Sequence, residues 1–149
     1  MGSSSILQVN FVKNRFSQYS RQAQAVYKKS LNEIMDDLVR TSSASAPHKS
    51  GTLEQSWSKE LYNYGSQPYG LVSYSATSRG RSGNFNYAMK MHEGGYSLGE
   101  GSRRKSGGTG MSGKHYPVGA NYLGGVLMGE QQAYKQHIED ALRNFSNRF

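Results

Sequence analysis

The stretch Tyr87-Ala88-Met89-Lys90-Met91-His92-Glu93-Gly94-Gly95 separates two long segments that are rich in glycine, serine and basic residues. Its larger apolar side chains occupy every second position, a period of two that is typical of a strand with two different faces. The pair His92-Glu93 places two titratable groups at the end of this segment, and the two glycines that follow would terminate it. We therefore expect a strand over Tyr87–His92.

Two segments have the periodicity of amphipathic helices. Residues 14–40 carry apolar side chains at steps of three and four, which places them on one stripe of a helix with Asn14 as its N-cap. A second stripe runs from Leu123 or Val126 to Phe145. Packing against a core explains both stripes, so neither predicts a cofactor site.

Shorter segments with alternating polarity predict strands. Ile6–Val12 alternates in this way, and so do Trp57–Tyr64 and Tyr69–Ala76. The turn residues 65–68 join the last two, which predicts a β-hairpin. Thr41–Pro47 is small and polar and ends in proline, so we expect the first helix to end there.

The region before the hairpin should connect the helix to the sheet. A single helical turn would carry Leu53 inward, and the lone tryptophan, Trp57, would anchor the core where this turn meets the sheet. The sequence thus predicts one α+β domain over residues 1–149, with a long N-terminal helix and a C-terminal helix packed on a mainly antiparallel sheet.

The composition favours a protein that binds partners over one that catalyses a reaction. Lysine and arginine number 18 against 10 aspartates and glutamates, a formal charge of +8 that favours polyanionic partners. The chain has eleven tyrosines, which suit half-buried surfaces and interfaces, and no cysteine, which excludes disulfides and thiolate chemistry. No apolar run approaches the ~20 residues of a membrane helix, and the first residues do not resemble a signal peptide.

Two basic segments are the best candidates for a functional surface. Residues 77–84 contain Arg79 and Arg81, and a glycine-rich stretch over 97–114 contains further cations. These are Arg103, Arg104, Lys105 and Lys114. We expect 97–114 to be a long mobile loop that a partner orders, because it offers no apolar face to bury. The alternative is a solvated loop whose charge serves solubility.

The motifs that could indicate nucleotide binding or a metal site lack the sequence context that such sites need. Residues 108–114 match G-x-x-x-x-G-K, but a phosphate loop needs a strand before it and a helix after it, and His115 stands where Ser or Thr would hold magnesium. The four histidines lack metal-ligand spacing. We therefore expect no catalytic residue, no cofactor and no metal, and we expect His92 to be a hydrogen-bonded structural residue.

The order of these elements resembles the tail-completion, or head-to-tail joining, family of tailed bacteriophages, also described as neck or minor capsid proteins. The resemblance rests on several short motifs spread over nearly the whole chain: Ala46-Pro47 followed by Gly51-Thr52-Leu53, Tyr87-Ala88 with His92-Glu93-Gly94, and Tyr122-Leu123 before the last helix. Gly94-Gly95 stands where Gly-Thr is frequent in that family, and Tyr122-Leu123-Gly124-Gly125 lacks the usual Pro-Phe-Leu start, which leaves the subfamily open.

The resemblance implies a non-enzymatic virion protein, made in the host cytoplasm and located in the neck. There it would form a homo-oligomeric ring, a hexamer or alternatively a dodecamer, between the portal or head connector and the tail terminator or tail tube. Double-stranded DNA would pass through the ring and contact it without sequence preference, and the 97–114 loop would dock a partner or line the channel.

Two rival functions remain open from the residues alone. A free nucleic-acid-binding protein would bind duplexes as a monomer, with an affinity that falls steeply as salt rises. An enzyme that uses His92 and Glu93 would lose its turnover in a His92→Ala variant.

Overall fold

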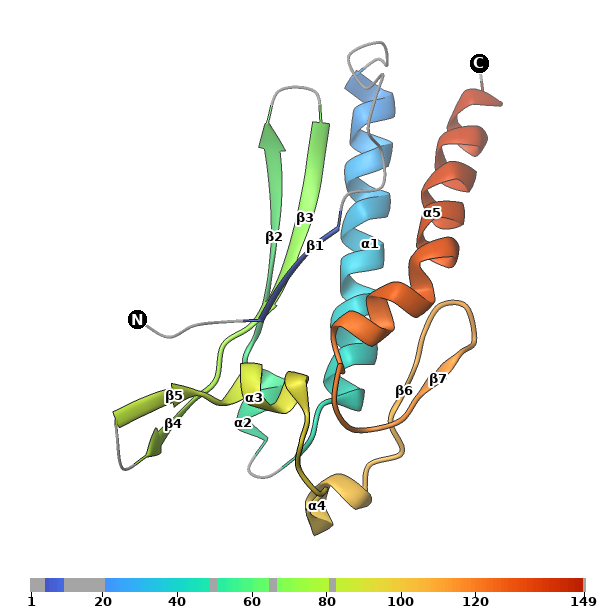
Figure 1. Cartoon of the computed structure of the whole chain (residues 1–149). Helices are drawn as coiled ribbons and strands as arrows, with labels where there is room; N and C mark the ends of the chain where they lie inside the picture. Colours follow the sequence, from blue (N-terminus) through green and yellow to red (C-terminus); the bar gives the residue numbers. More distant parts are fainter. Residues whose placement is uncertain (1–4, 10–20, 49–50, 65–66, 81–82, 149) are drawn as a thin grey trace.

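A computed structural model describes residues 5–9, 21–48, 51–64, 67–80 and 83–148 (Figure 1). The described part of the chain mixes helices with antiparallel strands, which confirms the predicted α+β class. The helices are α1 (Arg21–Ser45), α2 (Thr52–Gln55), α3 (Tyr87–Glu93), α4 (Glu100–Arg103) and α5 (Gly124–Ser146). The strands are β1 (Ser5–Val9), β2 (Trp57–Tyr64), β3 (Gln67–Tyr74), β4 (Thr77–Gly80), β5 (Gly83–Asn86), β6 (Gly108–Thr109) and β7 (His115–Tyr116).

The main sheet has three antiparallel strands in the order β1-β3-β2. The β2–β3 hairpin predicted from the sequence is confirmed, with Trp57 opposite Tyr74 and Tyr64 opposite Gln67. The predicted N-terminal strand is present as β1, which pairs with the other edge of β3. Its predicted continuation to Val12 lies outside the described residues, as does Asn14.

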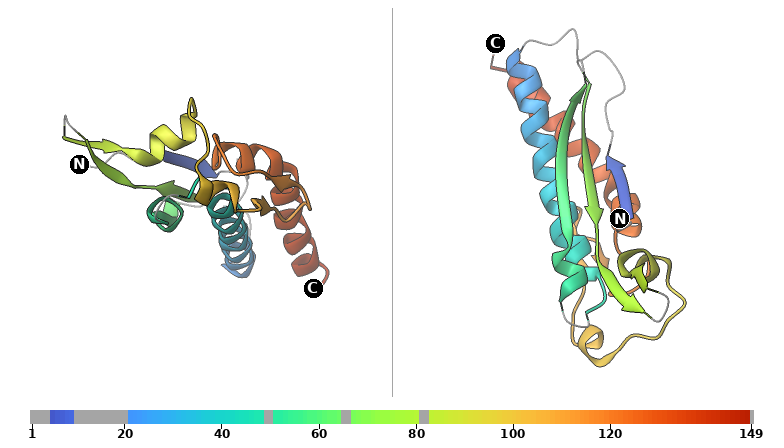
Figure 2. Two further views of the ribbon diagram at one scale, coloured as in Figure 1. Left: turned by 90° about the horizontal axis from the view of Figure 1, so that it is seen from below. Right: turned by 90° about the vertical axis from the view of Figure 1, so that its left-hand side faces the viewer.

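Helix α1 lies between the sheet and α5, and the two long helices run in opposite directions (Figures 1 and 2). Because α1 has neighbours on both sides, it is buried over much of its circumference. The core joins apolar residues of α1 to those of β3 and α5, among them Leu31, Ile34, Leu38, Val72, Tyr74, Val126, Tyr134 and Ile138. The C-terminal helix begins and ends close to the predicted positions.

The first helix continues to Ser45, beyond the predicted range of 14–40 but within the Thr41–Pro47 segment that was expected to end it. The serine hydroxyls return hydrogen bonds to their own helix: Ser42 Oγ donates to the Leu38 carbonyl, and Ser45 Oγ donates to the Thr41 carbonyl at 2.9 Å. Small hydroxyl residues in this turn thus satisfy their polar groups locally and remain buried.

The predicted strand over Tyr87–His92 is wrong, because these residues form α3. Ala88 is buried and Met91 packs against the core, whereas Met89 and Lys90 are exposed. This spacing of three is helical, although the same residues also alternate in polarity along the chain.

Residues 77–84 were expected to form a loop, but they belong to a β4–β5 hairpin in which Arg79 pairs with Asn84. Figure 1 shows this hairpin extending away from the body at the lower left. At its base, the Ala88 N–H donates to the Ala76 carbonyl at 3.3 Å.

Residues 97–114 do not form the loop without structure that the sequence suggested. They contain α4, β6 and the turn that leads into β7. Glycine makes this packing feasible: a Cβ on Gly108 would lie 2.3 Å from the Thr41 carbonyl oxygen, so no larger residue fits there. The segment buries backbone against α1 instead of an apolar face.

Trp57 does not anchor the core, because 42% of its surface is exposed. It begins β2, an edge strand of the sheet, and Leu61 on the same face of that strand is exposed to a similar degree. The residue that fills the expected place is Tyr74, which lies opposite Trp57 on the central strand and is fully buried.

Candidate functional site

The predicted basic residues do not share one role. Arg103 is exposed, and Arg104 forms an ion pair with Glu100 at 2.5 Å on the surface of α4. Lys114 Nζ donates to the Gly129 carbonyl at 3.2 Å. Arg79 lies on β4 in the projecting hairpin. Arg81 lies outside the described residues.

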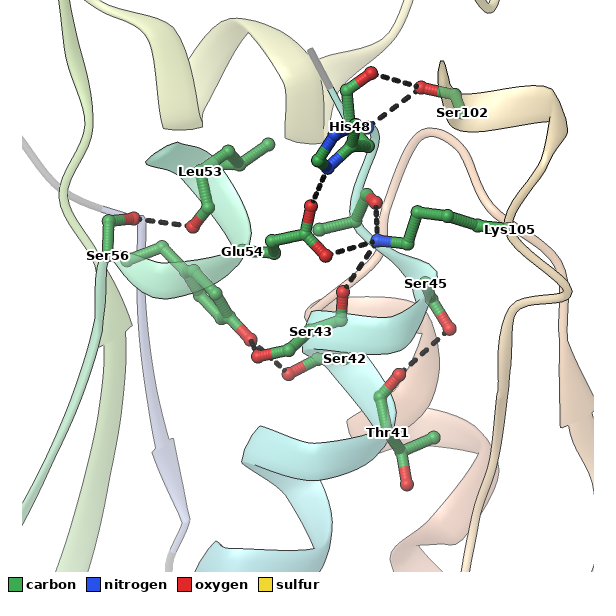
Figure 3. Close-up of polar contacts among 12 residues, drawn as sticks. Thr41, Ser42, Ser43, Ser45, His48, Leu53, Glu54, Ser56, Ser102 and Lys105 are labelled. Atoms are coloured by element: carbon green, nitrogen blue, oxygen red, sulfur yellow. Dashed lines mark hydrogen bonds and ion pairs between the residues drawn. The ribbon is translucent and has the colours of Figure 1, made fainter. Parts of the chain in front are cut away.

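Lys105 points into the protein instead of toward solvent (Figure 3). Its Nζ donates to the carbonyls of Ser43 and Ala46, at 2.9 and 2.5 Å, and lies 3.0 Å from the Glu54 carboxylate. These carbonyls belong to the end of α1, whose last turn contains no basic residue of its own. Lys105 therefore satisfies the free carbonyls at this end and complements the negative pole of the helix dipole.

Glu54 connects this cap to His48, whose Nδ1 contacts the other carboxylate oxygen. Partial burial opposes ionisation, but hydrogen bonds from His48 and Lys105 outweigh it and lower the pKa of Glu54. Ser102 on α4 holds the backbone of His48 from the other side: it accepts from the His48 N–H at 2.8 Å and donates to the His48 carbonyl at 3.1 Å. The network joins α1, α2 and α4 into one unit.

A second polar cluster fastens the β6–β7 hairpin to the two long helices. Glu130 on α5 is fully buried and accepts hydrogen bonds from the Ser112 N–H at 2.7 Å, the Ser112 hydroxyl and the Tyr116 hydroxyl at 2.7 Å. Burial, followed by the hydrogen bond to Glu130, raises the pKa of Tyr116. A Cβ on Gly110 would lie 2.2 Å from Glu130 Cδ, so glycine is required for this approach.

Asp37 on α1 extends the same cluster. Its carboxylate accepts from the Met111 N–H at 3.1 Å, from the Tyr134 hydroxyl at 2.8 Å and from Arg40 at 2.5 Å. Burial, together with the nearby Asp37 charge, raises the pKa of Tyr134. The donors around both carboxylates come from the β6–β7 segment and the two long helices, so these contacts fasten the segment to the helices.

The residues that carry the family resemblance are mostly structural. Leu53, Tyr122 and Leu123 are buried in the core, and the Tyr122 hydroxyl donates to the Ala88 carbonyl at 2.9 Å. His92 Nε2 accepts from the Gly124 N–H at 3.0 Å, at the first residue of α5.

His92 is therefore a hydrogen-bonded structural residue, as predicted. Burial lowers its pKa, which keeps the ring neutral as an acceptor. Glu93 is the exposed last residue of α3, and Gly94 follows it with its N–H donating to the Lys90 carbonyl at 3.1 Å. Tyr87 is the first residue of α3.

Residues 108–114, which match a phosphate-loop pattern, form a β-hairpin instead. The Gly110 N–H donates to the Lys114 carbonyl at 2.9 Å, and no helix follows directly. Within the part of the chain that the structure describes, no group of three or more His, Asp or Glu residues is placed to hold a metal ion. In the same part, none of the helices is long and apolar enough to cross a membrane.

The larger of the described pockets has a volume of about 320 Å³ and lies beside the His48 network. Its walls are mostly apolar, from Pro47, Met91, Tyr96 and Leu98, with Ser97 and Ser102 at the polar side. His48 also lines this pocket.

Comparison of the chain with protein-family models, curated proteins and solved structures finds no match.

Sequence reasoning did not find the two polar clusters. Asp37 and Tyr134 are 97 residues apart in the chain, and Lys105 and Glu54 are 51 apart, so no local spacing reveals them. The sequence near these residues is rich in glycine and serine, which is compatible with close backbone contact. This composition was interpreted as a sign of flexibility.

Proposed function

We propose that this chain is a structural protein of the neck of a tailed bacteriophage, where copies of it form a ring that joins the head to the tail. The proposal combines the family resemblance given above with the shape of the β4–β5 hairpin. A ring subunit needs surfaces that a neighbouring copy can cover, and we propose that this hairpin provides one of them.

The hairpin contacts the rest of the described chain chiefly through α3 at its base. A two-stranded hairpin on its own is marginally stable in water, so a second surface would stabilise it. A neighbouring subunit in a ring would supply that surface. The exposed Trp57 and Leu61 on β2 add apolar area that a subunit contact could bury.

The polar clusters fit a structural role better than an enzymatic one. The carboxylates Glu54, Asp37 and Glu130 are occupied by internal donors, and their partners fasten loops to helices. This leaves the +8 charge of the chain to act through exposed residues, which suits a ring that DNA passes through.

The experiment removes the hairpin without disturbing the body. Thr77 and Asn86 are directly opposite each other in the β4–β5 ladder, so residues 77–86 can be replaced by a short Gly-Ser linker. The shortened protein should keep its far-UV spectrum and melting temperature but should form no ring and join no heads to tails. A matched control changes only the hairpin tip, replacing residues 81–82 with Asn-Gly, and should retain assembly.

Assembly by the shortened protein at the level of the full chain would refute the proposed role of the hairpin. A monomeric full chain that binds duplex DNA and ignores phage particles would favour the alternative, a free nucleic-acid-binding protein.

A further inference from the structure

The start of α1 and the end of α5 meet at one end of the molecule, and this end is basic. Figures 1 and 2 show the two helix ends side by side. The described cations of this end are Arg21, Lys28, Lys29, Arg143 and Arg148. They lie far along the helix pair from α4, where the sequence placed its basic candidates.

A groove of about 240 Å³ runs between the two helices at this end. Lys29 of α1 and Arg148, two residues after the end of α5, line it from opposite sides, and Asn144 and the carboxylate residue Glu33 also line it. The hydroxyl of Ser30, a further lining residue, donates to the Val26 carbonyl of its own helix at 2.9 Å. Its apolar floor is formed by Val26, Ala141 and Phe145. The groove therefore presents two exposed cations beside an apolar floor.

The two cations that line the groove are not neutralised by the described part of the chain. Lys29 and Arg148 are exposed and form no ion pair with a described carboxylate, and the same holds for Arg21. Of the acids nearby, Glu33 itself lines the groove and lies 3.2 Å from His137 Nε2, and Asp140 pairs with Arg143 at 3.1 Å. An anion entering the groove would meet unpaired positive charge.

We propose that this basic groove, defined by Lys29, Asn144 and Arg148, binds the phosphate backbone of double-stranded DNA. Arginine and lysine contact phosphates directly, and neutral donors beside them fix the orientation of the phosphate without reading sequence. Lys28 is adjacent to Lys29 and Arg21 lies about two turns before it on α1, which adds positive charge at this end of the helix.

This inference deepens the proposed function, since it names the surface through which a neck ring would contact passing DNA. It also replaces the surface expected from the sequence. Lys105 caps the end of α1, and Arg104 is paired with Glu100, so the segment 97–114 is a poorer polyanion site than its composition suggested.

The test measures binding of the full-length protein to a 20-base-pair duplex by fluorescence anisotropy over a range of salt concentrations. Each lost phosphate contact should reduce the slope of log K against log salt by about 0.9, so a Lys29→Ala/Arg148→Ala variant should reduce it by about 1.8. Two duplexes of unrelated sequence should bind equally well to the unaltered protein.

The control variant, Arg104→Ala/Lys135→Ala, removes the same charge from two exposed positions that form ion pairs with Glu100 and Glu139. It should leave the slope within about 0.3 of the unaltered protein. An equal loss in both variants would overturn the inference, because net charge alone would then explain binding. Absence of duplex binding by the unaltered protein would also overturn it.

Failure here and failure of the neck proposal give different results. If the Lys29→Ala/Arg148→Ala variant still forms rings and joins heads to tails but binds DNA as before, only the groove is refuted. If the unaltered protein binds DNA through the groove but never assembles, the groove stands and the neck proposal is refuted.

Discussion

Replacing the buried carboxylate of Glu130 should destabilise the protein more than any other single change to a charged side chain in the β6–β7 region. Glu130 is fully buried and accepts three hydrogen bonds from Ser112 and Tyr116. Glu130→Ala removes the acceptor and leaves these donors without a partner in a confined space.

The size of the effect follows from the contacts. A hydrogen bond to a charged group contributes about 1.5–3 kcal/mol to the free energy of unfolding. The loss of three such bonds would cost about three times as much if they acted independently. Ser112 is exposed, so water can replace part of what its donors lose. We therefore expect Glu130→Ala to lower the free energy of unfolding by about 3–4 kcal/mol, and the melting temperature by about 10 °C.

Urea unfolding followed by circular dichroism measures this change. Glu130→Gln keeps the shape and one acceptor oxygen, so it should cost about half as much. Glu139→Ala, an exposed glutamate on the same helix, should change stability by less than about 0.5 kcal/mol. Amide exchange at Ser112 should quicken in Glu130→Ala. A Glu130→Ala protein as stable as Glu139→Ala would refute the claim that this carboxylate holds the hairpin to α5.

Other consequences can be measured with the same assay. Lys105→Met, which loses the carbonyls at the end of α1, should cost about 2–3 kcal/mol, whereas Arg103→Met on the exposed side of α4 should be neutral. Gly108→Ala should cost more than about 3 kcal/mol, because its Cβ would overlap the Thr41 carbonyl; a stable Gly108→Ala protein would show that the hairpin lies farther from α1. The folded pKa of His92 is lowered, so the unfolded chain binds its proton more readily and stability should fall as pH drops from 7 toward 5. His92→Gln should flatten this part of the pH dependence, and an unchanged profile would contradict the assignment.

Much of the scaffold follows from pattern alone. The apolar stripes of α1 and α5 extend over two or more helical turns, so their helical period is clear. The alternation in β2 and β3 extends over several residue pairs, so its period of two is also clear. The 87–93 segment was mispredicted because seven residues can alternate in polarity and still place Ala88 and Met91 on one helical face. Short segments cannot separate the two periods.

The polar clusters could not be predicted for a different reason. Lys105 resembles its neighbours Arg103 and Arg104 in sequence, and only the tertiary fold turns its side chain toward the end of α1. The glycines of residues 97–114 indicated a lack of structure, yet they are what allows the backbone to approach Thr41 and Glu130. Composition shows which residues are small. Only the packing of the folded chain shows whether a small residue makes the backbone flexible or allows it to approach another element closely.

The mass of the purified full-length protein tests the central claim most directly. Light scattering at several concentrations, with and without phage heads that carry portals, would give the number of copies in solution and on each particle. The proposed neck role predicts a closed ring, hexameric or dodecameric, either in solution or on the portal. A protein that stays monomeric at every concentration and does not bind to the heads would contradict it.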